Sequence, residues 1–130
     1  MQVQAAGAYE ELSAMKYEGS CHCGAIKFYF TAPQINDGLR CNCSICQRKG
    51  AIMTAFTVEP ENISITAEQN ALRVYEFGSC VAKHYFCNNC GIYPFHHSMS
   101  KPNQYRINIG CIRGIDSSNL PFEVFNGASI

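Results

Sequence analysis

Alternation of apolar and polar residues predicts short β-strands along most of the chain, from residue 17 onward. Ile26, Phe28 and Phe30 are separated by Lys27 and Tyr29, which is the period-two pattern of a strand with one buried face. The same pattern, bounded by Gly, Pro and Asn positions, recurs later in the chain. Further strands are expected at residues 54–58, 63–65, 72–77, 81–86 and 105–111.

Helical signals are short by comparison. Residues 44–50 are expected to form one helical turn, and Asp116 has the side chain to cap another. Neither segment is long enough to cross over between two parallel strands, so the sheets should be mostly antiparallel. The sequence therefore predicts a mainly β protein.

The first sixteen residues differ from the rest of the 130-residue chain. They are rich in Ala and are expected to be either a frayed helix or disordered, with Met15 as an alternative start of the protein. We therefore interpret residues 1–16 as an N-terminal extension and residues 17–130 as one domain, which fits the chain length.

Composition narrows the class of protein. The sequence is 47% hydrophobic and 15% charged, which is typical of a globular chain. Ten basic residues balance ten acidic ones, so no nucleic-acid partner and no anionic membrane are expected. No apolar run approaches the length of a membrane span, and the first basic residue, Lys16, comes too late for a signal peptide. We therefore expect a cytoplasmic protein.

The number and spacing of the cysteines indicate the chemistry of the protein. In a reducing compartment, clustered cysteines are more often metal ligands or catalytic groups than disulfides. Short spacings suit a metal because neighbouring thiolates must converge on one ion about 2.3 Å from each sulfur. Asn88, Asn89 and Gly91 also tolerate the turn that such a pair requires. Seven of the nine cysteines lie in three clusters, which are Cys21 with Cys23, then Cys41, Cys43 and Cys46, then Cys87 with Cys90.

Two other interpretations account for part of the pattern. Buried free thiols would explain Cys80 and Cys111, which stand alone, but not the three clusters. An iron–sulfur cluster also takes cysteine ligands, although no ferredoxin spacing is present. We favour zinc.

The number seven itself suggests a division into four and three. Two cysteine pairs complete one four-cysteine site, and the triad Cys41, Cys43 and Cys46 then leaves a fourth position open. Structural zinc sites are closed, whereas catalytic ones keep a position for water or substrate. Two Zn²⁺ ions per chain are expected, although spacing alone does not decide which pairs combine.

Three segments carry a family resemblance. GSCHCGAIKF, CNCSICQRKG and HYFCNNCG, followed by NIGCIRGID and LPFEVFNG, resemble the signature of the glutathione-dependent formaldehyde-activating enzyme family, also called the GFA or CENP-V domain. The resemblance runs from about residue 17 to near the C-terminus, and this chain looks like a short member.

The resemblance implies a fold, a ligand set and an activity. The fold is a zinc-bound β-tent of small antiparallel sheets. The activity joins glutathione to formaldehyde and is classed as a carbon–sulfur lyase, so a small thiol or its aldehyde adduct is the implied partner, with the true substrate open. The implied ligands are Cys21, Cys23, Cys87 and Cys90 on a structural zinc and Cys41, Cys43 and Cys46 on a catalytic one.

The remaining polar residues have weaker signals. Arg48 and Lys49 follow the triad and could balance its charge or bind a substrate carboxylate, but a solvated surface role is the simpler expectation. His22 should point away from the metal, and His84 should pack or hydrogen-bond within a strand. His96 and His97 are expected in a loop, where either could reach the open site.

Two non-lyase functions stay open. The triad could hold zinc or a thiol without turnover, as a binding module, or the whole chain could be a zinc-stabilised interaction domain. Methionine sulfoxide reductases share a zinc-bearing β-tent and are a further alternative. They require a nucleophilic cysteine on a late strand, for which Cys111 is a poor candidate.

Overall fold

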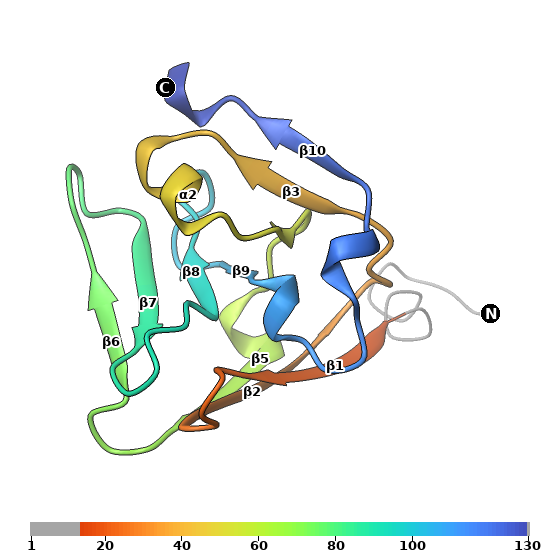
Figure 1. Cartoon of the computed structure of the whole chain (residues 1–130), viewed down its shortest axis with the longest axis vertical. Coiled ribbons are helices and arrows are strands. Elements are labelled where there is room, and N and C mark those ends of the chain that lie inside the picture. The colour runs from red at the N-terminus through yellow and green to blue at the C-terminus, as the bar shows by residue number, and fades with distance from the viewer. Residues whose placement is uncertain (1–13, 130) are drawn as a thin grey trace.

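The fold consists of three small sheets joined by loops and short helices. The computed structural model describes residues 14–129, which form a mainly β architecture as the sequence predicts (Figure 1). The first sheet has the order β1 (Met15–Ser20), β2 (Ile26–Ala32), β5 (Ile63–Ala67). The second has the order β10 (Phe122–Phe125), β3 (Gly38–Cys41), β4 (Met53–Thr54). The third has the order β6 (Leu72–Tyr75), β7 (Lys83–Cys87), β8 (Phe95–His97), β9 (Tyr105–Ile107).

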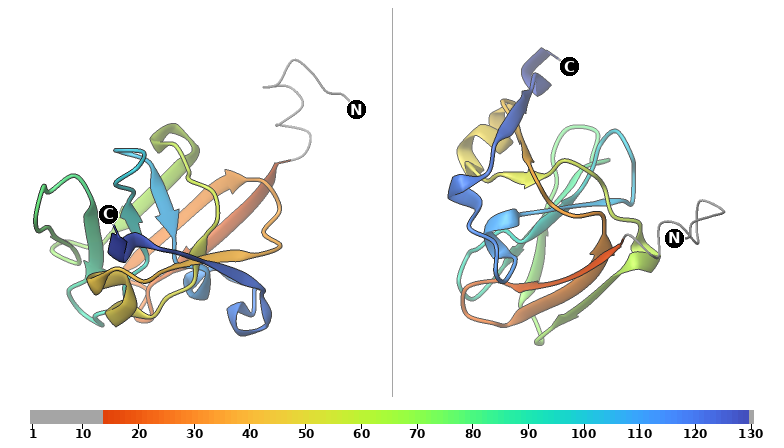
Figure 2. Two further views of the ribbon diagram at one scale, coloured as in Figure 1. Left: turned by 90° about the horizontal axis from the view of Figure 1, so that it is seen from above. Right: turned by 90° about the vertical axis from the view of Figure 1, so that its right-hand side faces the viewer.

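Pairing is antiparallel throughout the first and third sheets, in agreement with the prediction. The exception is in the second sheet, where β10 lies parallel to β3. Parallel strands need a long connection, and here residues 42–121 provide it, so no crossover helix is required. The last strand therefore returns to the segment that ends in the first cysteine of the triad (Figures 1 and 2).

Several predicted elements end earlier than expected. The strand predicted at 54–58 is reduced to β4, and Val58 makes only an isolated bridge with Tyr105. The strand predicted at 105–111 ends at Ile107, because the Asn108 side chain accepts a hydrogen bond from Gly110 N (3.0 Å) and starts a 3₁₀ turn. This turn is Ile109–Cys111, and the other 3₁₀ turns of the described residues are Pro60–Asn62, Ser117–Asn119 and Gly127–Ser129.

Both predicted helical segments are present. The α-helix α2 spans Ser44–Lys49 and ends at Gly50, whose φ of 68° is left-handed. Asp116 caps the turn Ser117–Asn119 by accepting a hydrogen bond from Ser118 N at 3.1 Å. No helix in residues 14–129 has the length and apolar character to cross a membrane.

The core lies between the first and third sheets. Ile26, Phe28 and Phe30 are buried and the intervening Lys27 and Tyr29 are exposed, so the period-two interpretation of this segment is confirmed. Phe28 meets Phe95 of β8 edge-on, with ring centroids 5.6 Å apart, and both rings are almost completely buried. This contact fixes β8, and with it the two histidines that follow Phe95.

The predicted N-terminal extension lies largely outside the described residues. The described chain enters β1 at Met15, which pairs with Ala32, so the first sheet begins before the boundary expected at residue 17. The interpretation of residues 1–13 is not addressed by the structure.

Candidate metal centres and the pocket beside them

Four cysteines from the first and third sheets converge at one point. Cys21 and Cys23 lie in the turn between β1 and β2, and Cys87 and Cys90 lie at the end of β7 and in the turn after it. The four Sγ atoms all lie within 4.8 Å of one another. The structure therefore brings together the four residues that the family resemblance implies as one ligand set.

The sulfur positions suit a tetrahedral metal. Cys23 Sγ lies 3.7 Å from both Cys21 Sγ and Cys87 Sγ. A Zn–S bond of about 2.3 Å in a tetrahedron gives sulfurs separated by about 3.8 Å, whereas a disulfide requires about 2.05 Å. All nine cysteines lie in the described part of the chain, and each is a free thiol.

Backbone amides further prepare this cluster for negative charge. Ile26 N donates to Cys21 Sγ at 3.3 Å, and Asn89 N donates to Cys87 Sγ at the same distance. A hydrogen bond from the backbone of Ile92 is the main reason that the pKa of Cys90 falls to about 6. Cys21 and Cys87 are buried in the core, whereas Cys23 is exposed and Cys90 is half-buried, so the cluster extends from the core to the surface.

The second cluster is the triad Cys41, Cys43 and Cys46. Cys41 ends β3, Cys43 is the N-cap of α2, and Cys46 lies one turn into that helix. Their sulfurs also lie within 4.8 Å of one another, and Cys43 N approaches Cys41 Sγ at 3.5 Å. Within residues 14–129, no fourth His, Cys, Asp or Glu belongs to this group. The donor set suits a soft metal ion with an open position.

The thiols of the triad differ in acidity. Burial raises the pKa of the Cys46 thiol to about 12, although the charge of Lys49 opposes this effect. Burial also acts to raise the pKa of Cys43, but hydrogen bonds from the backbone of Cys46 and from the neighbouring thiols bring it below its ordinary value. The Cys43 thiol therefore loses its proton more readily than the Cys46 thiol.

A pocket of about 650 Å³ opens directly onto the triad. Its volume is within the range of pockets that hold small molecules. All three cysteines line it, together with residues from α2, β7, β8 and β9 and from the C-terminal segment. The triad therefore faces a space that a ligand can enter.

Arg48 and Lys49 lie in different environments beside this pocket. Arg48 is exposed and donates to Ser44 O of its own helix (2.8 Å), as expected of a surface residue. Lys49 turns inward, and its Nζ lies 2.9 Å from His84 Nδ1 and 3.5 Å from the centre of the Tyr93 ring. Burial lowers the pKa of Lys49 to about 8, while the triad thiolates act in the opposite direction. The expectation of a surface role is wrong for Lys49.

The histidines also lie in different environments. His96 and His97 lie on β8 and not in a loop, because this segment pairs with both β7 and β9. Successive strand residues point to opposite faces, so His96 lines the pocket, while His97 packs between the rings of Tyr85 and Tyr105. His84 also lines the pocket, in addition to making the hydrogen bond expected of it. His22 belongs to neither cysteine group.

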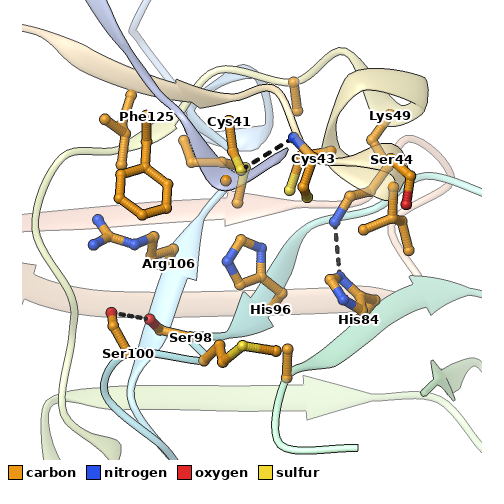
Figure 3. A pocket seen from close by; sticks show the side chains of 18 of the residues that line it. Cys41, Cys43, Ser44, Lys49, His84, His96, Ser98, Ser100, Arg106 and Phe125 are labelled. Carbon is orange, nitrogen blue, oxygen red and sulfur yellow. Dashed lines mark hydrogen bonds between the residues drawn. The ribbon is translucent and has the colours of Figure 1, made fainter. Parts of the chain in front are cut away.

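Figure 3 shows the polar wall of the pocket, with His96 between Arg106 and the Lys49–His84 pair. Burial, followed by the charge of Lys49, lowers the pKa of His84 to about 4 and that of His96 well below its ordinary value. Burial also raises the pKa of Tyr93 far above its usual range, so its hydroxyl stays protonated beside His96 Nδ1. The ammonium group of Lys49 donates to His84 Nδ1, so the neutral His84 carries its proton on Nε2.

The C-terminal segment covers the triad, which sequence reasoning did not predict. Asn42, between the first two cysteines, donates to Asn126 Oδ1 (3.0 Å) and accepts from Ala128 N (2.9 Å). Gly127 consequently packs so closely on Cys41 Sγ that a Cβ atom would have no room there. The only sequence signal was the FNG ending of the family-like closing segment.

Two groups of thiols with metal-ligand geometry, one of four cysteines and one of three that faces a pocket, define a small β protein with two candidate metal centres. The chain belongs to the glutathione-dependent formaldehyde-activating enzyme (GFA) family, whose model matches residues 16–127. The crystal structure of a Rhodobacter sphaeroides protein is similar, with a TM-score of 0.73 and 34% identity over 82% of this chain and 99% of that one.

A curated relative matches over a shorter stretch. A protein of Halomonas elongata with the provisional name of a glutathione-dependent formaldehyde-activating enzyme is 50% identical over 34 residues. This match covers 26% of the present chain and 22% of the relative. The family and the fold are thereby shown, and the activity requires a separate argument.

Proposed function

We propose that this chain is a zinc-dependent carbon–sulfur lyase that interconverts a thiol–aldehyde adduct with its free thiol and aldehyde. The observation that supports this most is the triad Cys41, Cys43 and Cys46, which faces a pocket and has no fourth protein ligand among residues 14–129. The proposal includes two Zn²⁺ ions per chain, one at the triad and one at the four-cysteine cluster.

The donor set favours a thiol over water as the partner of the triad. Three thiolates exceed the charge of one Zn²⁺ ion and blunt its ability to activate water, whereas a soft thiol is a well-matched fourth donor. When bound, the metal would lower the pKa of an incoming thiol so that a thiolate exists at neutral pH.

The residues of the pocket then act on charge and on the proton. Lys49, held by His84, places a positive charge on the wall beside the excess negative charge of the triad. In the cleavage direction the hydroxyl group of the adduct passes its proton to water in the open pocket, the carbonyl forms, and the carbon–sulfur bond breaks with its electron pair on sulfur. His96, which burial keeps neutral, lines the same pocket and is the proposed hydrogen-bond donor to that oxygen.

The proposed partner is a small thiol such as glutathione or its aldehyde adduct, as the names of the family and of the Halomonas elongata relative suggest. The proposed compartment is the cytoplasm, whose reducing conditions would keep all nine cysteines as thiols. The alternative function is a non-catalytic zinc- or thiol-binding module.

The adduct forms spontaneously in water, so the decisive experiment measures exchange at equilibrium. Magnetisation-exchange NMR on glutathione and formaldehyde should show faster interconversion with the zinc-loaded protein than in buffer. The acceleration should disappear in Cys43→Ser. Thiol binding without faster exchange would favour the binding module. If X-ray absorption at the zinc edge shows no additional sulfur ligand at saturating glutathione, glutathione is not the partner.

A further inference from the structure

Three large apolar side chains line the pocket, although each is substantially exposed to solvent. Phe77 lies in the loop between β6 and β7, Met99 follows β8, and Phe125 ends β10. Their exposed fractions are 44%, 53% and 47%. Single exposed apolar residues are common, but three that converge from separate segments on one pocket indicate an apolar binding surface.

The same pocket contains positive charge and no acidic side chain. Lys49 and Arg106 line it, and no Asp or Glu is among its lining residues. In the part of the chain that the structure describes, the ion pairs are Lys83 with Glu76 and Arg113 with Glu18, so Arg106 has no carboxylate partner. Burial lowers the pKa of Arg106, while the negative charge of Cys41 acts in the opposite direction, so this cation also faces the triad.

Arg106 keeps hydrogen-bonding capacity for a ligand. Its Nη1 donates to Thr54 O at 2.9 Å, which holds the side chain in place but uses one of its five N–H donors. Ser98 and Ser100, joined by a hydrogen bond of 3.0 Å, line the pocket on the side of Arg106 (Figure 3). A planar guanidinium with two hydroxyl groups nearby is well suited to a carboxylate.

The positive charge near the triad exceeds what the triad itself requires. Three thiolates with one Zn²⁺ carry a single negative charge, which the ammonium group of Lys49 balances. Arg106, on the other side of His96 in Figure 3, adds a second positive charge that also acts on Cys41. The two cations together exceed the single negative charge by one, and this surplus is available to an anionic ligand.

We propose that the pocket selects a ligand that is both anionic and partly apolar, with its carboxylate on Arg106 and its apolar portion against Phe77, Met99 and Phe125. Resting on the function proposed above, this assigns the substrate class as a carboxylate-bearing thiol adduct whose apolar part is larger than the single carbon of formaldehyde. Arg106 is then a specificity-determining residue.

Sulfur-free probes test the pocket independently of thiol chemistry. Calorimetric titration of the zinc-loaded full chain should show that octanoate binds about tenfold more tightly than octanol, because only the acid can accept charge-assisted hydrogen bonds. Arg106→Gln should remove this preference, whereas Arg113→Gln, which changes a surface arginine, should retain it. Phe77→Ala should weaken octanoate binding about threefold and leave acetate binding unchanged.

Equal binding of octanoate and octanol to the unaltered protein would overturn the proposal, as would a preference that survives in Arg106→Gln. If Arg106→Gln fails to fold, the acid–alcohol comparison in the unaltered protein and the Phe77→Ala series still decide. An ω-mercaptooctanoate titration separates the two proposals. If it binds no more tightly than octanoate, the thiol function fails while the anionic, apolar pocket stands. If it binds more tightly but octanoate shows no preference over octanol, only the substrate class fails.

Discussion

The two cysteine clusters offer the same kind of sulfur ligand but differ in number and in surroundings. In the first cluster Cys21 and Cys87 are buried, at 2% and 0% exposure, whereas Cys23 is exposed and Cys90 is half-buried. The triad Cys41, Cys43 and Cys46 is half-buried and opens onto a pocket. The number of thiols therefore separates a cluster that can complete a tetrahedral shell by itself from one that leaves a position for a ligand.

The clusters also differ in how much chain they connect. The contact of Cys23 with Cys87 joins segments 64 residues apart, whereas the triad lies within a single six-residue stretch. A metal that joins distant segments stabilises the fold by restricting the unfolded chain, and a local site restricts it much less. The comparison predicts that the first cluster contributes mainly to folding and the second mainly to ligand binding.

The largest effect is expected for Cys87→Ser. A structural zinc ion contributes about 10–16 kcal/mol of apparent binding free energy, which equals or exceeds the stability of most domains. This variant should lose the metal of the four-cysteine cluster and fail to give a cooperative thermal transition by circular dichroism. Cys80→Ser, which changes an exposed cysteine outside both clusters, should melt like the unaltered protein.

A smaller effect is expected for Cys46→Ser. The variant should stay folded, with a melting temperature lowered by no more than about 5 °C, because the triad is local and lies beside a pocket. Native mass spectrometry should show two zinc ions in the unaltered protein and one in the variant. If Cys46→Ser and Cys87→Ser melt alike, the division into a folding site and a ligand site is wrong. An iron-containing protein would overturn the zinc assignment itself.

Lys49→Met sharpens the comparison within the ligand site. The change removes the cation beside the triad and should weaken glutathione binding about tenfold, since 1.4 kcal/mol of lost electrostatic free energy corresponds to that factor. Arg48→Met is the matched control, because Arg48 is adjacent in sequence but exposed and bonded to Ser44 O. Calorimetry on both variants checks this, and equal weakening would mean that only the overall charge matters.

The cysteines and the alternating strands were predictable because their signals are local. Spacing identified seven cysteines for two sites, and period-two alternation identified β2. The family resemblance added the pairing of Cys21 and Cys23 with Cys87 and Cys90, which spacing alone left open. The structure brings these four together because β1–β2 and β7 border a common core.

The walls of the pocket were not predictable because they depend on tertiary contacts. Nothing in the sequence around Arg106 indicates that β9 directs it toward a triad 60 to 65 residues away in the sequence. Lys49 and Arg48 are indistinguishable as a dipeptide, and only the position of α2 against His84 separates them. The parallel pairing of β10 with β3 was not predicted. The strand β10 is short and all four of its residues are exposed, so it has no buried face that a period-two pattern could indicate.

The smallest effect is expected for Gly127→Ala, which tests whether the C-terminal segment shapes the triad. A Cβ atom at this position would press on Cys41 Sγ and come within 3.2 Å of Cys43 Cβ, so either the sulfur or the segment must shift. Overpacking costs about 1–3 kcal/mol in a tight core, and the exposed segment can relax, so zinc affinity at the triad should fall about fivefold. Competition with a chromophoric chelator, which resolves the two ions by affinity, should detect the change at the triad alone.

The four-cysteine site in the same molecule is the control for this measurement. Unchanged affinity at both sites would mean that the segment moves aside freely, and that the hydrogen bonds of Asn42 to Asn126 and Ala128 do not hold Gly127 against the triad.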